Sequence, residues 1–302
     1  MPYPGGKGGA GVYQTIINGM PRHEVYVEPF LGGGAVMAAK RPAGLNIGVD
    51  LDAEAIAQAQ ARIVGTDDTR SALASDGDAA ADALVTMRED IARKGDVGSA
   101  LAGRGDAADS PGEAMREGTA GSGRTAGAIV SEGDNGRYEF HVGDGIAFLQ
   151  KYPFHGGELV YCDPPYLHST RRDPCLYRYE MTVDQHEALL AVLLRLPCLV
   201  CISGYWSELY TDTLSTWRGC PFQAQTRRGI VTEYLWCNYP APTALHDYRY
   251  LGKDFREREK LKRLMARWVK RLQAMPLLQR QALQAALAQV DNGVGLYRQG
   301  WR

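Results

Sequence analysis

Four consecutive residues, Asp163, Pro164, Pro165 and Tyr166, directly follow an apolar run at 159–162 that is typical of a buried strand. The two prolines restrict the backbone where it leaves the strand, so a carboxylate, a carbonyl oxygen and an aromatic ring are held in fixed directions. This set suits a planar heterocycle with an exocyclic amine: the amine donates to Asp163 and the Pro164 carbonyl, and the ring stacks on Tyr166. The four residues are candidates for catalysis, although a plain turn can have the same sequence.

A second candidate site is the glycine-rich stretch at 28–35, which reads E-P-F-L-G-G-G-A and lies between a predicted strand and a predicted helix. Glycines at such a turn let a ligand approach the backbone closely, as in dinucleotide sites. Asp50 follows Gly32 by 18 residues and ends the next predicted strand, where a carboxylate can accept hydrogen bonds from ribose hydroxyls. Together they predict an adenosine-bearing cofactor, whereas the glycines alone also fit a tight turn.

The N-terminal segment Y-P-G-G-K places Tyr3 and Lys7 in a loop with little side-chain bulk. Together with the F-L-G-G-G and D-P-P-Y elements, in this order, it resembles the DNA adenine methylase (Dam) family of S-adenosyl-L-methionine-dependent N(6)-adenine DNA methyltransferases. The resemblance covers residues 1–64 and 138–239, about half of the chain. It implies a Rossmann-like class I methyltransferase fold, S-adenosyl-L-methionine as the cofactor and double-stranded DNA as the partner.

The resemblance also implies roles for individual residues. Catalysis would fall to Asp163, Pro164, Pro165 and Tyr166, with Asp163 between the cofactor and the target base. The cofactor site would contain Tyr3, Lys7, Glu28, Phe30, Gly32, Gly34, Asp50, Asp144 and Asp163. Because the adenine amine would attack the methyl group directly, neither a metal ion nor a covalent enzyme intermediate is expected.

A base inside a duplex cannot reach such a pocket, so it must flip out, and flipping requires a grip on the DNA backbone. The segment at 167–179 contains Arg171, Arg172 and Arg178, and a predicted hairpin contains Arg227 and Arg228. We expect these arginines and the basic C-terminal helix to contact phosphates. The alternative is that they are ordinary exposed arginines. Residues 203–205, at the end of the strand after the D-P-P-Y turn, are candidates for lining the base pocket.

Short apolar runs alternate with helical patterns along the chain, which favours an α/β fold with a mostly parallel, doubly wound sheet. Seven strands are predicted at 25–30, 45–50, 138–142, 158–162, 198–203, 222–227 and 233–239. Helices are predicted between them at 34–39, 53–64, 146–152, 183–196 and 207–214. The last two strands are expected to form a hairpin that adds an antiparallel strand to the sheet.

Two segments lie outside this pattern. Residues 65–136 contain fourteen acidic and seven basic residues and no aromatic residue, so we expect a flexible acidic insertion where the Dam family has its target-recognition domain. Such a segment is poorly suited to reading base edges, which predicts a short recognition sequence or relaxed specificity. Residues 241–302 are expected to form a basic tail with helices at 254–274 and 277–290. Residues 1–64 and 137–240 then form the catalytic domain.

Composition narrows the alternatives. The chain has 302 residues and a net charge of -1, and it contains neither a long apolar stretch nor the apolar core of a secretory signal. We therefore expect no membrane span, a cytoplasmic location and no obligate protein partner. Cytosine-N4 in DNA and adenine in RNA remain alternative substrates, and a catalytically silent nucleic-acid-binding homologue is a further alternative. An NAD-type oxidoreductase is disfavoured because no G-x-G-x-x-G follows a predicted strand.

Overall fold

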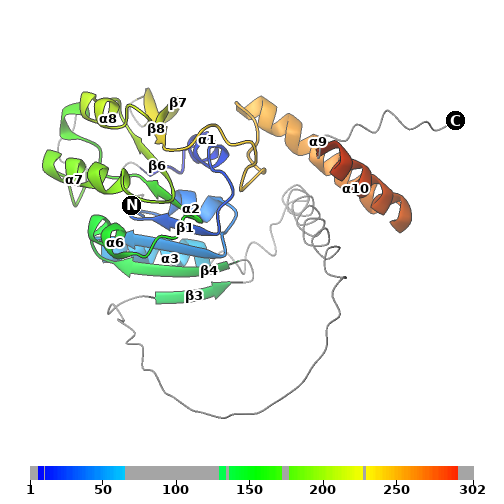
Figure 1. Ribbon diagram of the computed structural model, residues 1–302, viewed down its shortest axis with the longest axis horizontal. Helices are drawn as coiled ribbons and strands as arrows, with labels where there is room; N and C mark the ends of the chain where they lie inside the picture. The colour runs from blue at the N-terminus through cyan, green and yellow to red at the C-terminus, as the bar shows by residue number, and fades with distance from the viewer. Residues whose placement is uncertain are drawn as a thin grey trace, which may run out of the picture. The chain divides into compact units, whose positions relative to one another are not determined.

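The computed structural model describes residues 6–9, 11–64, 129–133, 136–171, 177–226 and 229–291. One mixed sheet has the strand order β3-β4-β2-β1-β5-β6-β8-β7 (Figure 1). The strands are β1 (Val25–Glu28), β2 (Leu45–Asp50), β3 (Ile129–Gly133), β4 (Gly136–Val142), β5 (Glu158–Cys162), β6 (Leu199–Gly204), β7 (Arg218–Thr226) and β8 (Gly229–Cys237). The central strands β4, β2, β1, β5 and β6 run parallel, whereas β3, β8 and β7 are antiparallel to their neighbours.

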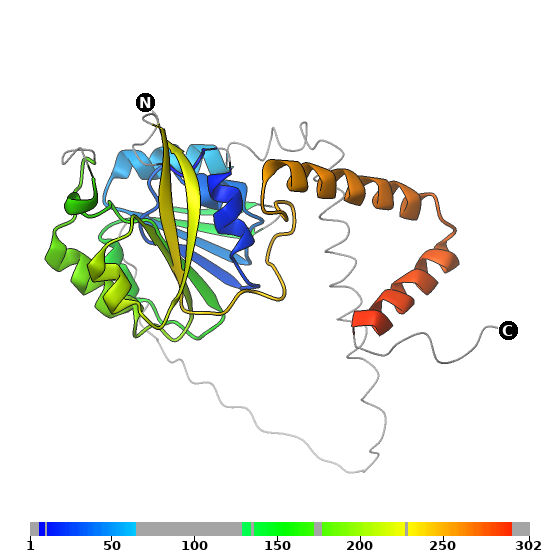
Figure 2. The same ribbon diagram turned by 90° about the horizontal axis from the view of Figure 1, so that it is seen from above.

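Helices cover both faces of this sheet (Figure 2). One set is α1 (Val12–Asn18), α2 (Ala35–Ala39) and α3 (Ala53–Val64), and the other is α6 (Gly145–Lys151), α7 (Val183–Leu193) and α8 (Glu208–Thr213). Met37 and Ile56 belong to one buried core, and Leu149 and Leu189 belong to a second. Strand β5 is buried along its whole length because helices pack on both faces. The predicted α/β architecture, mostly parallel and doubly wound, is confirmed.

Two elements of the structure are not predicted from the sequence. Helix α1 begins after Gly11, which has a φ of +90°, and it buries Ile16 and Ile17. Its seven residues are too few to show a repeating helical pattern, and the surrounding glycines favour a loop. Strand β3 pairs with β4, with Ser131 opposite Tyr138, so the sheet has eight strands. β3 lies within the range expected as an insertion, and the rest of that range, except Gly136, lies outside the described residues.

Strands β7 and β8 form the predicted hairpin, with Thr226 opposite Gly229. β7 begins at Arg218, earlier than the predicted residue 222, because Pro221 interrupts the sequence pattern of a strand. A proline fits at this position because β7 is an edge strand of the sheet.

The C-terminal helices predicted from the sequence are α9 (Phe255–Gln273) and α10 (Leu277–Asp291). Residues 260–291 belong to a second compact unit. Helix α9 has Glu257 in its first turn and Lys270 and Arg271 in its last, a distribution that favours the helix dipole. None of the described helices combines the length and apolar character needed to cross a bilayer.

Candidate active site

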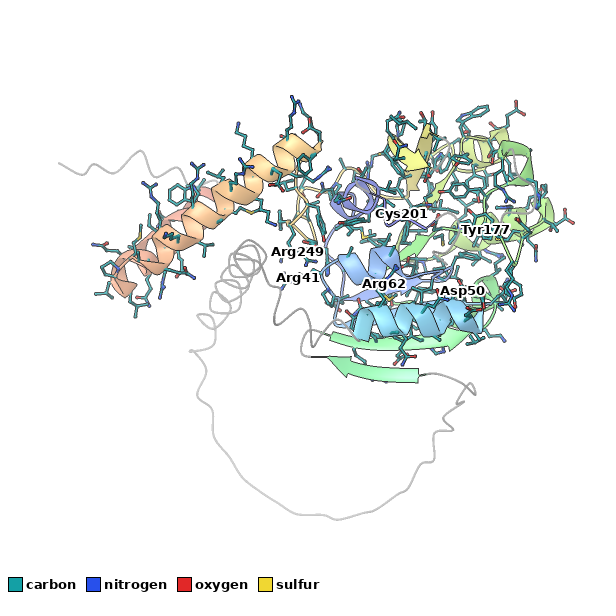
Figure 3. The ribbon with its side chains drawn as sticks, turned by 180° about the vertical axis from the view of Figure 1, so that it is seen from behind. Arg41, Asp50, Arg62, Tyr177, Cys201 and Arg249 are labelled. Atoms are coloured by element: carbon teal, nitrogen blue, oxygen red, sulfur yellow. The ribbon has the colours of Figure 1, made fainter. Side chains whose placement is uncertain are left out.

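The carboxyl ends of the parallel strands meet at one edge of the sheet, where most predicted site residues lie. They line an open cleft of about 900 Å³, counted to include its mouth. Its predicted lining residues are Lys7, Glu28, Phe30, Gly32, Asp50, Asp144, Asp163 and Pro165. In Figure 3, Asp50 and the further lining residue Tyr177 lie at this edge, and Arg41 and Arg249 lie at the opposite end. The fold thus joins the glycine-rich and D-P-P-Y motifs in one cavity. Tyr3 lies outside the described residues.

The glycine-rich turn is held tightly by its neighbours. The Gly32 N–H donates to Asp50 Oδ2 at 2.7 Å. Gly34 precedes α2 with a φ of +61°, and a Cβ there would lie 2.9 Å from the Cβ of Ala59 in α3. Gly34 is therefore required for the backbone turn and the close helix packing, and it does not line the cleft itself.

The Asp50 carboxylate is fixed by backbone groups on both oxygens. Oδ2 bonds to Gly32, and Oδ1 accepts from the Asp52 N–H at 2.9 Å. Burial raises the pKa of Asp50 above its ordinary value, and these N–H bonds oppose the rise. Because each carboxylate oxygen has two lone pairs, Asp50 can still accept hydrogen bonds from the hydroxyls of a ligand.

Asp144 has a structural role in addition to its place on the cleft. Its Oδ1 accepts from the backbone N–H groups of Ile146 at 2.7 Å and Ala147 at 3.1 Å, which caps helix α6. No donor within the described part of the chain contacts Oδ2. The cap fixes the carboxylate and leaves this second oxygen for a ligand.

Lys7 lies in a buried polar network beside the cleft. Its Nζ is 2.7 Å from Asp163 Oδ1 and 3.5 Å from Glu233 Oε2, and it donates to the Tyr166 hydroxyl at 2.7 Å. Burial alone would lower the pKa of Lys7, but the two carboxylates raise it above its ordinary value. Lys7 is therefore an ammonium group held between two carboxylates.

Tyr166 is buried in the same network. Its hydroxyl donates to Glu233 Oε2 at 2.8 Å, its ring packs edge-on against Tyr205 at 4.8 Å, and Lys7 Nζ lies 4.7 Å from the ring centroid. Burial raises the pKa of Tyr166 well above its ordinary value, so the phenol stays neutral. Pro164 is buried as well, while Pro165 lines the cleft. Tyr166 packs and forms hydrogen bonds here, and base stacking on its ring stays a prediction.

Glu28 ends β1 and lines the cleft although its side chain is buried. Burial and the nearby charge of Asp163 raise the pKa of Glu28 to about 8. Tyr26 donates a hydrogen bond to its Oε2 at 3.2 Å. At neutral pH Glu28 is mainly a neutral acid, which can donate as well as accept a hydrogen bond.

The arginines predicted to contact phosphates differ in their surroundings. The Arg171 side chain is 4% exposed and forms a bidentate pair with Glu180, at 3.1 and 2.5 Å. This pairing contradicts the exposed position expected for Arg171. The side chain instead forms an ion pair with Glu180. Arg178 is 62% exposed and lies 3.2 Å from Asp52 Oδ1. The remaining three, Arg172, Arg227 and Arg228, lie outside the described residues.

Three residues of the site are not predicted from the sequence: Glu233, Tyr177 and Glu180. Glu233 is a single charge in the otherwise apolar end of β8 and is only 6% exposed, which is the pattern that could have indicated it. Tyr177 and Glu180 line the cleft from a loop whose sequence gives no such signal. Across the described ranges, no group of three His, Cys, Asp or Glu side chains is arranged to hold a metal ion.

No family model matches the chain, and no curated protein matches it. Matching solved structures include a conserved hypothetical protein from Streptococcus pyogenes, with 14% identity over 78% of this chain and 100% of that chain and a TM-score of 0.40. A precorrin-8w decarboxylase from Methanobacterium thermoautotrophicum has 12% identity over 79% of this chain and 94% of that chain, with a TM-score of 0.36. An rRNA methylase from Streptococcus thermophilus has 10% identity over 74% of this chain and 93% of that chain, with a TM-score of 0.35. Likeness at this level supports no conclusion about the chemistry of this chain.

Proposed function

We propose that this protein transfers the methyl group of S-adenosyl-L-methionine to the N6 amine of adenine in double-stranded DNA. One observation carries the proposal: Gly32 and Asp50 line the same cleft as Asp163 and Pro165. A place suited to an adenosine-bearing cofactor is therefore continuous with a fixed carboxylate suited to an amine. The two motifs would carry little weight if the strand order placed them at different edges of the sheet.

The residues that line the cleft fit S-adenosyl-L-methionine in chemistry. Asp50 would hold the ribose hydroxyls, and the absence of side chains at Gly32 and Gly33 would let the ligand approach the backbone. Glu28, with a pKa of about 8, would not repel the ligand carboxylate at neutral pH. When bound, the sulfonium supplies an electrophilic methyl group.

The D-P-P-Y turn would activate the target amine. Asp163 would accept a hydrogen bond from one N–H of the amine, and the Pro164 carbonyl would accept one from the other N–H. These two bonds favour a tetrahedral nitrogen with an available lone pair. Preorganised groups of this kind typically contribute about 3–4 kcal/mol each to transition-state stabilisation. Alignment of the amine with the methyl group would supply much of the remaining acceleration.

Helix α9 supplies a cationic surface suited to a DNA backbone. Arg256, Lys260, Arg263, Arg267 and Arg271 recur every three or four residues, so they lie along one side of the helix, and all five are exposed. The distance from residue 256 to residue 271 is roughly 22 Å at 1.5 Å per residue, enough to follow several phosphates. We propose that this stripe contacts the duplex.

Charge removal on α9 tests this contact. Lys260→Gln combined with Arg267→Gln should weaken DNA binding and reduce the slope of log K against log salt by about 2, because each cation displaces about one counterion. Lys151→Gln removes an exposed charge from α6 and is the control, with no expected change in slope. Equal slopes for the double variant and the wild type would contradict the α9 contact.

Cytosine-N4 in DNA and adenine in RNA are the alternative substrates, since the same amine chemistry would serve. The order of the three motifs, which resembles the Dam family, favours adenine in duplex DNA. A catalytically silent homologue is disfavoured because Asp163 lines an open cleft.

Incubation with methyl-labelled S-adenosyl-L-methionine and unmethylated duplex DNA, followed by nucleoside analysis, tests the proposal. We expect label in N6-methyl-2′-deoxyadenosine of the DNA, and loss of label with folding retained in Asp163→Ala. Label in a cytosine product or in RNA would select an alternative substrate, and cofactor binding without transfer would select the silent homologue. Mapping the methylated sites tests the short or relaxed recognition sequence, which a strict site of about six base pairs would contradict.

A further inference from the structure

The two oxygens of the Asp163 carboxylate have different surroundings. Oδ1 lies 2.7 Å from Lys7 Nζ and accepts a hydrogen bond from Ser203 Oγ at 2.8 Å. No donor contacts Oδ2 among the residues that the structure describes. The side chain is 17% exposed and lines the cleft. One oxygen is therefore held by the protein, and the other is left for a ligand.

Ser203 is fixed by the neighbouring strand. It is fully buried, and its Oγ lies 3.1 Å from the Tyr161 hydroxyl and 3.3 Å from the Cys162 carbonyl. A serine hydroxyl has a single hydrogen, and Asp163 is the nearer and charged acceptor, so Ser203 donates to Asp163 and accepts from Tyr161. Because β5 and β6 are paired in parallel, the sheet register sets the position of this hydroxyl.

Glu233 fixes Lys7 from the adjacent strand. It lies on β8, which pairs with β6, and its side chain is 8% exposed. Its Oε2 accepts from Tyr166 at 2.8 Å and lies 3.5 Å from Lys7 Nζ. The ammonium of Lys7 is thus held by Asp163, Glu233 and the Tyr166 hydroxyl together, and it can rotate little without losing one of them.

We infer that Ser203 and Glu233 are positioning residues for the Asp163 carboxylate, Ser203 directly and Glu233 through Lys7, and that they reserve Oδ2 for the N–H of the substrate amine. The identity of that amine rests on the proposed function. The orientation of Asp163 does not, because it follows from contacts between strands β5, β6 and β8 and the N-terminal segment.

The charges of the network are consistent with this role. One ammonium and two carboxylates leave a net charge of -1 beside the cleft, so Lys7 does not cancel the negative charge that an amine would meet. The other titratable groups around Asp163 add little net charge at neutral pH: the pKa of Glu28 is about 8, burial raises the pKa of Tyr161 and Tyr177, and the Arg171 cation is paired with Glu180. Asp163 and Glu233 therefore dominate the local potential.

Three substitutions test the inference. Glu233→Gln keeps an acceptor for Tyr166 but removes the charge, so kcat should fall by about tenfold to a hundredfold while KM for the cofactor changes little. The alkaline limb of the kcat–pH profile of this variant should also move to lower pH, because Lys7 loses one of the two carboxylates that raise the pKa of Lys7. Ser203→Ala should lower kcat by about tenfold without moving that limb. Glu208→Gln, which removes an exposed carboxylate on α8, is the control and should match the wild type.

A second measurement needs no substrate. In protein labelled with ¹³C-lysine, the Lys7 signal, identified by its loss in Lys7→Met, should titrate at lower pH in Glu233→Gln than in the wild type. An unchanged Lys7 titration, or wild-type kcat in both Glu233→Gln and Ser203→Ala, would overturn the inference even if DNA adenine is methylated. A shifted titration without adenine methylation would instead leave the network standing and reject the proposed function. Ser203→Ala keeps the test available if Glu233→Gln does not fold.

Discussion

Lys7 and Lys40 are both buried, but their surroundings shift their pKa values in opposite directions. Lys7, at the cleft, is 5% exposed and lies between the carboxylates of Asp163 and Glu233, which raise its pKa above the ordinary value against the effect of burial. Lys40 is 1% exposed, and burial lowers its pKa to about 7. Both lysines are buried, so burial does not by itself decide whether a lysine remains protonated.

The difference lies in the partners of the two lysines. Lys40 Nζ donates to the Arg41 carbonyl at 2.7 Å and lies 4.2 Å from the Tyr26 ring centroid. Within the described residues no carboxylate lies within ion-pair distance of it. Arg41, which follows Lys40 in the chain, lies at the end of the sheet opposite the cleft (Figure 3). At neutral pH the Lys40 amine is only partly protonated at this end, whereas Lys7 keeps its positive charge at the cleft.

Removing the Asp163 carboxylate should reduce activity more than any other change at these two lysines. In Asp163→Asn, Lys7 keeps one of its two carboxylates, Glu233, and under the proposed function the substrate amine would lose its charged acceptor. We expect methyl transfer to fall by about 10²–10³-fold, measured in single-turnover assays with labelled cofactor. Folding, measured by circular dichroism, should be unchanged and serves as the control. A variant with the wild-type rate would remove Asp163 from the mechanism.

Removing the cation at the cleft should cost stability. Lys7→Met leaves the buried carboxylate of Glu233 and the partly exposed carboxylate of Asp163 with no ammonium between them, which should lower the free energy of unfolding at pH 7 by about 3 kcal/mol. Repulsion raises both carboxyl pKa values in the folded variant, so its stability should recover as the pH falls towards about 5. Urea unfolding of variant and wild type at both pH values measures this. An equal loss of unfolding free energy at both pH values would show that lost packing, and not lost charge, is responsible.

Removing the other buried lysine should have the opposite pH signature. Lys40 has a folded pKa of about 7 and an unfolded pKa of about 10.4, so wild-type stability is lost as the pH falls through this window. Relative to Lys40→Met, the wild type should therefore gain about 1 kcal/mol per pH unit between pH 7 and 10. Denaturant unfolding across this range checks the slope, with Lys151→Met as the exposed control. Parallel stability curves would mean that Lys40 stays charged.

The smallest expected effect involves the histidines near Lys40. His246 stacks on His23 at 3.8 Å, and burial lowers the pKa of His246 to about 4. Since the unfolded pKa is about 6.5, its contribution is present above pH 6.5 and lost as the pH falls towards 4. His246→Gln keeps an N–H donor for the Arg41 carbonyl, so acid unfolding should shift to lower pH by a few tenths of a unit, followed by circular dichroism. A shift to higher pH would indicate that the stack matters more than the titration.

The positions of Asp50 and Asp163 could be predicted because each directly follows an apolar run or lies at its end, and parallel strands bring such ends to one edge. The contact between Lys7 and Tyr166 joins residues 159 positions apart, and no local pattern reports it. Glu233 reaches Lys7 only because β8 lies next to β6 in the strand order. The sequence therefore indicated which residues meet at the edge but not which of them form hydrogen bonds.

Local patterns also failed where a side chain had a partner close by in the chain. The arginines after the D-P-P-Y turn suggest an exposed basic loop, but Arg171 pairs with Glu180 and is withdrawn from solvent. Strand β3 was missed because its neighbours in the sequence are rich in Gly, Ala and acidic residues, and only pairing with β4 makes it a strand.

The packing of Gly34 against Ala59 has a kinetic consequence. A turn tied to α3 by this contact and to β2 by the Gly32–Asp50 hydrogen bond cannot open without separating the helix from the sheet. The glycine-rich half of the cleft is thus preformed, and a ligand that binds there has no slow isomerisation to wait for. In stopped-flow experiments, ligand association at this half of the cleft should give a single-exponential trace whose observed rate constant rises linearly with ligand concentration.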